Sequence, residues 1–209
     1  LAGDAQTYAT QALANAATAQ AGAAANTAEL SYFAVNSTGT GATAADSDAI
    51  AIGSAARAEE SATVAIGVSS LASQTDTVAV GGGAAATASD ATAIGNLAAA
   101  TGVRSIALGA SSEARSTDSV AIGGNAISEG DVALGSVALA QGGSSTALGD
   151  GATASGARSV ALGAGSVADD DDTVSVGTNG SERRIVNVAD GTADSDAATV
   201  SQLNAAIGG

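Results

Sequence analysis

A short motif of the type Val-Ala-Ile-Gly recurs ten times between residues 50 and 177, and this repetition constrains the fold more than any other feature. Successive motif glycines are 14 residues apart, except Gly123 and Gly135, which are 12 apart. A fixed short period is typical of solenoid proteins, in which each repeat forms one coil of a continuous stack. The copies begin at Ile50, Val64, Val78, Thr92, Ile106, Val120, Val132, Thr146, Val160 and Val174, and Phe33-Ala34-Val35-Asn36 resembles a degenerate first copy.

Each repeat contains a second short extended segment. The third residue after each motif glycine is Ala or Ser, and the fifth is Ala in eight of nine intervals. Because alternate residues of a strand point to opposite faces, Val120 and Ile122 face one way and Ala121 the other. The constant small residue predicts close packing on its face as well as on the branched face. We therefore expect strands buried on both faces, with the alanine-lined face open to a partner chain.

The segments that follow the second extended segment are polar and variable, as in Ser73-Gln74-Thr75-Asp76. Such segments are typical of surface loops, which tolerate changes in length. The two-residue deletion in the repeat lies in one of them, between Ser128 and Val132. Each motif glycine is expected at a tight corner, because a corner often requires a positive φ.

The composition rules out an ordinary core. The 209 residues include one Phe, two Tyr and no Trp, Met, Cys, His or Pro. Large side chains supply most of the buried area in globular proteins, so this chain must stack thin coils or share its core with other chains. Nine intervals between coils predict a rod roughly 43 Å long. One thin coil leaves a face uncovered, and identical chains around a threefold axis would cover it.

The charge pattern excludes several classes of partner. The net charge is −15, and the six basic residues form no basic stripe. Binding of nucleic acid or of an anionic membrane surface requires such a stripe, so we expect neither, and no direct membrane contact. No run of 18 apolar residues exists to span a membrane as a helix. The sequence has neither a starting Met nor a signal peptide, and we expect it to be a piece of a longer protein.

The repeated string Ser119-Val120-Ala121-Ile122-Gly123 resembles the head of trimeric autotransporter adhesins, the YadA-like class of Gram-negative surface proteins. Residues 175–203, SVGTNGSERRIVNVADGTADSDAATVSQL, resemble the neck of these adhesins. The family pattern there is an Arg, then I-x-N-V-A-D-G, then D-A-V-x-x-x-Q-L, and Ala198 stands where Val is usual. The matching neck positions are Arg184, Ile185, Asn187, Val188, Ala189, Asp190, Gly191, Asp196, Ala197, Gln202 and Leu203.

The resemblance implies an all-β fold: a left-handed parallel β-roll of 14-residue coils that assembles as a homotrimer. It places the head at residues 33–177, the neck at 178–199 and the start of a coiled-coil stalk at 200–209. Residues 1–32 are expected to form an Ala-rich helical or coiled-coil lead, or else a disordered one.

The neck has further features that fit this division. Arg184 is expected to form an ion pair between chains that fastens the neck. Candidate N-caps of the stalk helix are Asp194, Ser195 and Asp196. The residues with the spacing of a coiled-coil seam are Val200, Leu203 and Ile207.

An enzymatic function is not expected. The repeat also resembles the hexapeptide repeat of left-handed β-helix acyltransferases, but those have 18 residues per coil and use a His, which this chain lacks. Hard cations prefer oxygen ligands, so Asp169 to Asp172 could bind Ca²⁺, but we expect this run to be a solvated loop that keeps like charges away from the stack. We therefore expect no catalytic residue, no cofactor and no metal site.

The resemblance implies a bacterial cell-surface adhesin, anchored in the outer membrane through a C-terminal domain outside this sequence. Its expected partners are host extracellular matrix proteins or cell-surface receptors, bound multivalently. The alternative is a non-binding structural spacer in a longer adhesin, with adhesion carried by other domains. If the head binds a ligand, the variable fourth residues after the motif glycines are candidates for contact: Arg57, Leu71, Glu113, Ile127 and Val167.

Overall fold

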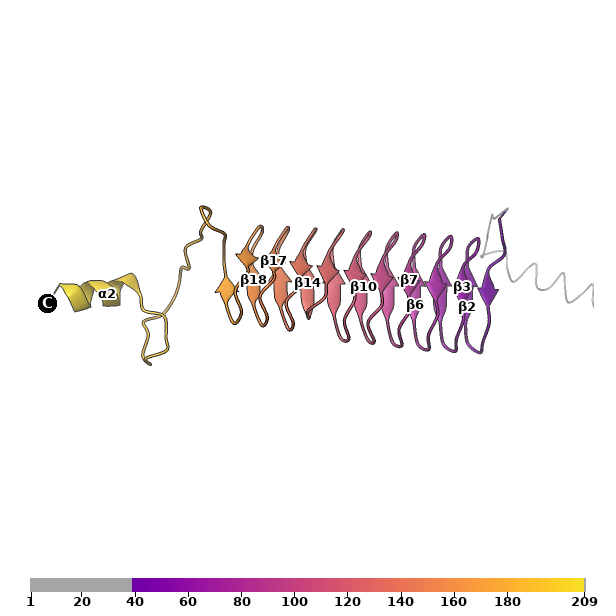
Figure 1. Ribbon diagram of the computed structural model, residues 1–209, viewed down its shortest axis with the longest axis horizontal. Helices are drawn as coiled ribbons and strands as arrows, with labels where there is room; N and C mark the ends of the chain where they lie inside the picture. Colours follow the sequence, from indigo (N-terminus) through magenta and orange to yellow (C-terminus); the bar gives the residue numbers. More distant parts are fainter. Residues whose placement is uncertain (1–38, 209) are drawn as a thin grey trace, which may run out of the picture.

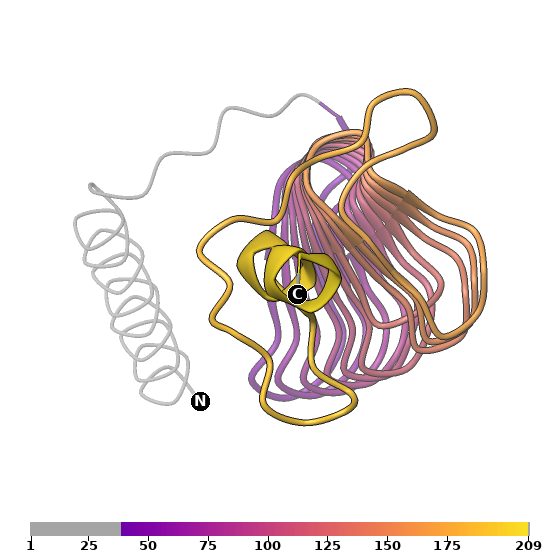
Figure 2. The ribbon, with the colours of Figure 1, turned by 90° about the vertical axis from the view of Figure 1, so that its left-hand side faces the viewer.

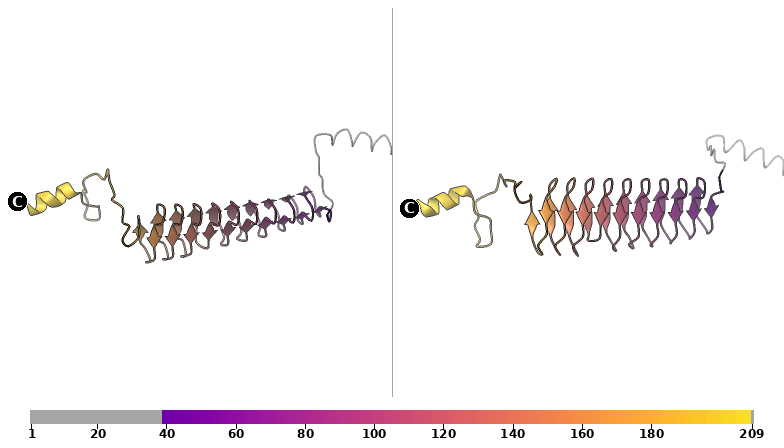
Figure 3. Two further views of the ribbon diagram at one scale, coloured as in Figure 1. Left: turned by 90° about the horizontal axis from the view of Figure 1, so that it is seen from above. Right: turned by 45° about the horizontal axis from the view of Figure 1, so that its top comes forward.

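The computed structural model describes residues 39–208, so the expected N-terminal lead at residues 1–32 lies outside the described residues. The described chain is an all-β parallel solenoid of about ten coils, followed by one helix, α2 (Val200–Ile207). The coils stack side by side along one axis, and the neck and α2 continue beyond the last coil (Figure 1). The views from above and from an oblique angle show the same regular rod (Figure 3).

Two ten-stranded parallel sheets form the two sides of the roll, and every coil contributes one strand to each. We call them the odd sheet and the even sheet after their strand numbers. The odd sheet contains β1 (Thr43–Ala44), β3 (Arg57–Ala58), β5 (Leu71–Ala72), β7 (Ala85–Ala86), β9 (Ala99–Ala100), β11 (Glu113–Ala114), β13 (Ile127–Ser128), β15 (Leu139–Ala140), β17 (Thr153–Ala154) and β19 (Val167–Ala168). The even sheet contains β2 (Ile50–Ile52), β4 (Val64–Ile66), β6 (Val78–Val80), β8 (Thr92–Ile94), β10 (Ile106–Leu108), β12 (Val120–Ile122), β14 (Val132–Leu134), β16 (Thr146–Leu148), β18 (Val160–Leu162) and β20 (Val174–Ser175).

The register repeats from coil to coil. Ile106 of β10 pairs with Val120 of β12, which pairs in turn with Val132 of β14 across the short coil. The short coil therefore keeps the strand pairing and loses its two residues from the loop between β13 and β14, as the sequence predicts. Equivalent residues form columns that run the length of the rod, about 4.8 Å apart.

The interior of the roll consists of small side chains. Ala107 and Ala121 of the even sheet and Ala114 of the odd sheet are fully buried between the two sheets. The prediction of close packing at the constant small residue is thus confirmed. The prediction that alanines line the open face is wrong, because the alanines point into the roll. The branched residues point outward instead, and Leu108 is 41% exposed. The interior is narrow, so only methyl-sized and hydroxyl side chains fit between the sheets.

Hydroxyl groups inside the roll support its corners. The hydroxyl of Thr63 donates to the carbonyl of Glu60 at 2.6 Å, and those of Ser70 and Ser112 donate to the motif glycines Gly67 and Gly109 at 3.0 and 2.9 Å. These side chains are fully buried. Each hydrogen bond satisfies a polar group in the interior and fixes the turn between the two sheets.

Seen along the rod, the two sheets are joined by turns at two opposite corners of the roll (Figure 2), and the sequences of these corners differ in chemistry. We call the corner that follows the even-sheet strands the glycine corner, because each segment begins with a motif glycine; its segments are residues 53–56, 67–70, 81–84, 95–98, 109–112, 123–126, 135–138, 149–152 and 163–166. It carries a single charged residue, Asp150. We call the opposite corner the acidic corner; its segments are residues 45–49, 59–63, 73–77, 87–91, 101–105, 115–119, 129–131, 141–145, 155–159 and 169–173, and they contain most of the acidic residues of the roll.

The helix α2 begins later than its expected caps. Thr199 is the N-cap, and a capping box joins its side chain to the backbone of Gln202 and the Gln202 side chain to the Thr199 backbone. The prediction that Asp194, Ser195 or Asp196 caps the helix is therefore wrong. Asp196 instead accepts hydrogen bonds from the backbone N–H groups of Thr192 and Ala193, at 2.9 and 3.0 Å. Within residues 39–208, no helix has the length and hydropathy that a membrane crossing requires.

Candidate functional site

The variable residues singled out in the sequence lie in one column on the outer surface of the odd sheet. Arg57 pairs in register with Leu71, and Glu113 with Ile127. Val167 lies in the same column at the C-terminal end, beside Thr153. The side chains are exposed or half-buried. The column therefore presents positive, apolar and negative groups along one flat surface.

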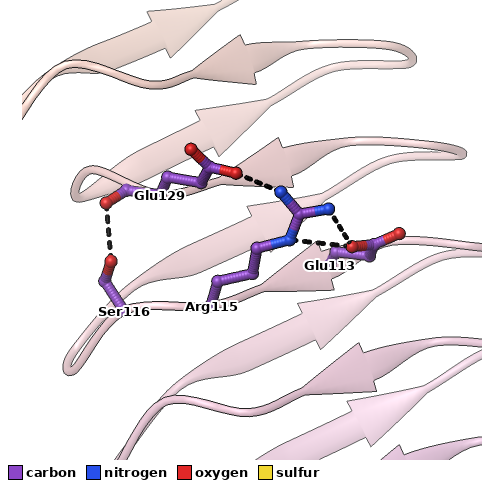
Figure 4. A network of polar contacts seen from close by, with 4 residues as sticks. All are labelled: Glu113, Arg115, Ser116 and Glu129. Atoms are coloured by element: carbon purple, nitrogen blue, oxygen red, sulfur yellow. Dashed lines mark hydrogen bonds and ion pairs between the residues drawn. The ribbon is translucent and has the colours of Figure 1, made fainter.

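An ion-pair network crosses this surface at the short coil (Figure 4). The Nε of Arg115 donates to Oε2 of Glu113 at 2.9 Å, and its guanidinium also contacts Glu129 of the next coil. The hydroxyl of Ser116 donates to the carbonyl of Glu129. The hydrogen bonds that Arg115 donates to Glu113 and to Glu129 raise the pKa of Arg115. The network thus joins two coils where the loop is two residues shorter.

Two similar pairs connect coils at the acidic corner. The Nε of Arg104 donates to Asp118, and the Nε of Arg158 donates to Asp172, both at 2.6 Å. These hydrogen bonds hold the pKa values of both carboxyl groups below their ordinary value. Asp171 accepts the backbone N–H of Ala157 at 2.8 Å. Two carboxylates of the acidic run at residues 169–172 are therefore engaged with the preceding coil.

The outer surface of the even sheet is an uncharged and mostly apolar face, interrupted by Thr92 and Thr146. Every strand from β2 to β18 contributes two outward side chains, and no charged residue lies among them. In one chain these residues are exposed or half-buried. A face of this length and character marks an interaction surface. The large hydrophobic residues most exposed on it are Ile50, Ile94, Ile106, Leu108, Leu134, Leu148, Leu162 and Val174.

The glycine corner continues this apolar face. Val68, Leu97 and Val137 project from it and are each more than half exposed. Leu97 and Val137 have φ values of 58° and 56°. A branched residue in this left-handed region is unfavourable, and Gly, Asn or Ser occupies the equivalent position in most other coils. The bulky side chains here are therefore not explained by the stability of a single roll.

Arg183 closes the C-terminal end of the roll. Its guanidinium donates to the hydroxyl of Ser166 at 2.8 Å, to the carbonyl of Val176 at 2.7 Å, and to the carbonyl of Ala164. It therefore fastens the neck to the last coil. An open pocket of about 560 Å³ lies at this end of the roll, lined in part by Asp169, Asn179, Glu182 and Arg183. This role of Arg183 is not predicted from the sequence, although the Arg-Arg pair just after the last repeat is a usable signal.

Four of the expected neck residues lie at or beside the start of α2: Asp190, Gly191, Gln202 and Leu203. The side-chain amide of Gln202 accepts from the backbone N–H of Gly191 at 2.9 Å and donates to its carbonyl at 2.8 Å. The Thr199 hydroxyl donates to Asp190 at 2.6 Å. These bonds fold the segment before α2 back onto its first turn. Leu203 lies on the same helix, with an exposed side chain.

The remaining expected neck residues do not join this cluster. Arg184 is exposed and makes no ion pair with any residue of the described range 39–208. Ile185 and Val188 are exposed apolar residues of the extended neck. Asn187 has a φ of 61°, a conformation that Asn tolerates better than most residues. In one chain, this part of the neck presents its side chains to the outside.

The repeats match a known family directly. A family model described as the YadA head domain repeat matches overlapping segments that together span residues 58–179. The chain belongs to the YadA-like trimeric autotransporter adhesins. A second model, the coiled stalk of trimeric autotransporter adhesin, matches residues 184–209.

A solved structure agrees with this adhesin assignment. The crystal structure of the collagen-binding domain of the Yersinia adhesin YadA superposes with a TM-score of 0.60 and 31% sequence identity. The match covers 84% of this chain and all of that one. The comparison with curated proteins finds no match. The resemblance inferred from the sequence is therefore confirmed, for the head as well as for the neck and stalk.

Membership of the family gives the roll and the helix their general roles. The solenoid is an adhesin head, and α2 lies in the stalk region of the adhesin. YadA-like adhesins are outer-membrane autotransporters displayed at the cell surface, and such adhesins are normally not enzymes. The even-sheet face, the glycine corner and the neck all leave large apolar side chains exposed in a single chain.

Proposed function

We propose that three copies of this chain assemble with their even sheets facing a common axis. The supporting observation is the uncharged apolar face along the whole even sheet, which is half-exposed in one chain. Burial of apolar surface contributes about 25 cal/mol per Å², so a face of this length supplies a strong drive for assembly. Three left-handed rolls packed in this way share the core that each thin roll lacks.

The glycine corner supports a particular arrangement of the three rolls. It is uncharged except at Asp150, and it exposes Val68, Leu97 and Val137 beside the even sheet. In a closed threefold ring, one edge of each copy contacts a different surface of the next. The glycine corner is the edge that fits such a contact, and the acidic corner is the edge that fits solvent.

The domain division follows from the same arrangement. We assign residues 33–177 to the head, 178–199 to the neck and 200–209 to the start of the coiled coil. Val200, Leu203 and Ile207 are exposed along α2 and form the seam between the three helices. Arg184 forms its ion pair with a neighbouring copy.

The head itself carries the adhesive function. It binds an extracellular matrix protein, with collagen as the first candidate, rather than serving as a spacer. The observation that carries this proposal is the 31% identity over the full length of the collagen-binding domain of YadA. The odd sheet is the surface that an assembled trimer leaves open, so the column containing Arg57, Leu71, Glu113 and Ile127 is the proposed contact surface.

Trimer formation makes this binding multivalent. Each surface patch is presented three times, and linked weak contacts exceed a single contact by about 10²–10⁴-fold in apparent affinity. Weak binding by one odd-sheet column is therefore sufficient for firm attachment. A host-cell receptor with repeated epitopes is bound by the same principle.

Binding of the purified trimer to immobilised collagen, fibronectin, laminin and cultured cells tests the proposal. We expect saturable binding to at least one of these surfaces. Double replacement Leu71→Ser and Ile127→Ser on the odd sheet is expected to weaken it by about tenfold or more. The matched control is Thr75→Ala in the acidic corner, which leaves the column intact. Absence of saturable binding on every surface would establish the spacer function instead.

A further inference from the structure

A two-residue Asn-Gly turn lies at the tip of the hairpin that joins the roll to the neck. Thr178 and Ser181 form an antiparallel bridge, with the N–H of Ser181 donating to the carbonyl of Thr178 at 2.8 Å. Between them, Gly180 has a φ of 80°, the value that a type II turn requires at its third position. Asn179 and Gly180 are both exposed. The side-chain amide of Asn179 therefore directly precedes the backbone nitrogen of Gly180 in the chain, and Gly180 has no Cβ that would crowd this nitrogen.

The carboxylate of Glu182 lies next to the backbone nitrogen of Gly180. The N–H of Gly180 donates to Oε1 of Glu182 at 2.8 Å. A general base must lie within about 2.6–3.2 Å of the group whose proton it takes, and Glu182 meets this condition. The hydrogen bonds from Gly180 and from its own backbone hold the pKa of Glu182 below its ordinary value, so it is ionised at neutral pH. Nucleophile and base are thus in contact, the arrangement that activates a weak nucleophile.

We propose that Asn179 is a site of self-catalysed deamidation, with Gly180 supplying the nucleophile and Glu182 the base. The nitrogen of Gly180 attacks Cγ of Asn179, and a bond forms between these two atoms. The proton of Gly180 passes to Glu182 and then to the departing amide nitrogen. The bond from Cγ to Nδ2 breaks, and ammonia leaves. The product of this step is a cyclic imide at Asn179.

Water completes the reaction. Addition of water at Cγ reopens the ring to a normal aspartate, whereas addition at the main-chain carbonyl carbon gives an isoaspartate, in which the chain runs through the side chain. No oxidant or reductant takes part. Both products carry a negative charge in place of the neutral amide, and the isoaspartate adds a methylene group to the backbone of the turn.

The turn lies beside Arg183, so deamidation there is expected to affect the contact between the neck and the last coil. Asn179 and Glu182 line the same pocket as Arg183, whose guanidinium fastens the neck to the last coil. A new carboxylate or a lengthened backbone at Asn179 lies four residues before that anchor. Deamidation is therefore expected to loosen the contact of Arg183 with Ser166 and Val176. The junction between head and stalk then changes with the age of the protein.

Three of the four other asparagines of the described chain provide an internal comparison. Asn96, Asn125 and Asn187 are followed by Leu97, Ala126 and Val188, each of which has a side chain beside the attacking nitrogen. Steric hindrance at that nitrogen slows ring closure, because attack requires close approach in a near-attack geometry. Glycine is the residue that removes this hindrance. Reaction at Asn179 and not at these sites is the expected pattern.

The test is prolonged incubation of the purified chain at physiological temperature and neutral pH, followed by peptide mapping by mass spectrometry and by enzymatic isoaspartate detection. We expect both products to accumulate at Asn179 while Asn96, Asn125 and Asn187 stay intact. Asn179→Gln abolishes the signal, because its ring would contain one more atom. Glu182→Gln keeps the shape but removes the base, and it slows the reaction by about tenfold or more.

Two results would overturn the proposal. One is an Asn179 that stays as intact as the other asparagines. The other is a Glu182→Gln variant that reacts as fast as the parent chain or faster, because the carboxylate would then shield the nitrogen instead of activating it. Asn179, Gly180 and Glu182 are exposed, so neither replacement disturbs the packed interior of the roll.

Discussion

At the scale of single residues, the motif glycines are needed because neighbouring coils approach closely. Gly109 has a φ of 135°, and a Cβ built there would lie 2.5 Å from the carbonyl oxygen of Gly123. Real Cβ atoms do not approach backbone atoms so closely. The same contact recurs in adjacent coils, for example between Gly95 and Gly109. Glycine therefore recurs in the sequence because the coils stack too closely at this corner for a Cβ to fit.

Replacement of Gly109 by Ala is expected to destabilise the roll by about 3 kcal/mol or more, since backbone strain and the clash with Gly123 add. The matched control is Gly151→Ala, because Gly151 has a φ of 61° and no atom within 4 Å of an added Cβ. That change should cost about 1 kcal/mol. Denaturant unfolding followed by circular dichroism measures both. Equal losses in the two variants would contradict the role of close approach.

The pair of Arg158 and Asp172 gives a prediction about pH. The hydrogen bond from Arg158 lowers the pKa of Asp172 from its ordinary value of 3.8. Its contribution to stability is thus fully present above that value and is lost as the pH falls through the lowered pKa. Asp172→Asn should lower the melting temperature slightly at neutral pH, because the pair is exposed.

Melting curves of the parent chain and of Asp172→Asn across a pH series check this. The difference in melting temperature should shrink towards zero as the pH falls below the pKa of Asp172. Asp170→Asn is the control, since the side chain of Asp170 forms no ion pair within residues 39–208. A difference that persists in strong acid would argue against the ion pair.

At the scale of elements, the last coil depends on the neck. β19 and β20 have no further coil to pair with, and the N–H of Val167 donates to the carbonyl of Gly177 instead. Arg183 adds hydrogen bonds to Ser166, Val176 and Ala164. An exposed sheet end invites unwanted pairing, and covering it is a common solution. The neck hairpin at residues 178–183 therefore stabilises the end of the roll as well as leading to the stalk.

Replacement of Arg183 by Ala is expected to lower the local stability of the last coil by about 1–2 kcal/mol, because it leaves carbonyl groups without their donor. Hydrogen exchange of the amides in β17 to β20 measures this loss. Arg57→Ala, in β3 near the other end of the roll, is the control and should leave exchange in these strands unchanged. Equal exchange in the two variants would show that Arg183 does not hold the end of the roll.

At the scale of the whole molecule, the roll has a small-residue interior and an apolar exterior face. Alanine and serine between the sheets bury little area per residue, whereas the larger Ile, Leu and Val side chains lie on the even-sheet surface. Most of the large hydrophobic side chains therefore remain on the surface of a single chain, and the proposed trimer would bury them. Stability of the head is expected to depend on protein concentration, as in any assembly whose folded subunit needs its partners.

Leu108→Ser on the even sheet is expected to weaken the assembly by about 2 kcal/mol per copy. Sedimentation analysis should show the trimer dissociating at concentrations where the parent chain remains trimeric. Leu139→Ser on the outer surface of the odd sheet is the control and should leave the trimer intact. A parent chain that sediments as a folded monomer of 19.2 kDa would contradict the proposed assembly.

The sequence by itself determined the coil, its length, the parallel stacking and the position of the shortened loop. These features depend on a fixed spacing of glycine and small residues, which a linear pattern records completely. It also located the neck and, through the family resemblance, the adhesin class. The variable residues from Arg57 to Val167 were placed in one column, because a constant period aligns equivalent positions.

Only the tertiary structure decided which face of each strand points inward. Alternation shows that Ala121 and its neighbours Val120 and Ile122 face opposite ways, but either set could line the interior. The narrow gap between the two sheets selects the alanines, and this places the branched residues on the surface. The roles of Arg183 and Thr199 also depended on the folded chain, since their partners are set by how the neck turns back.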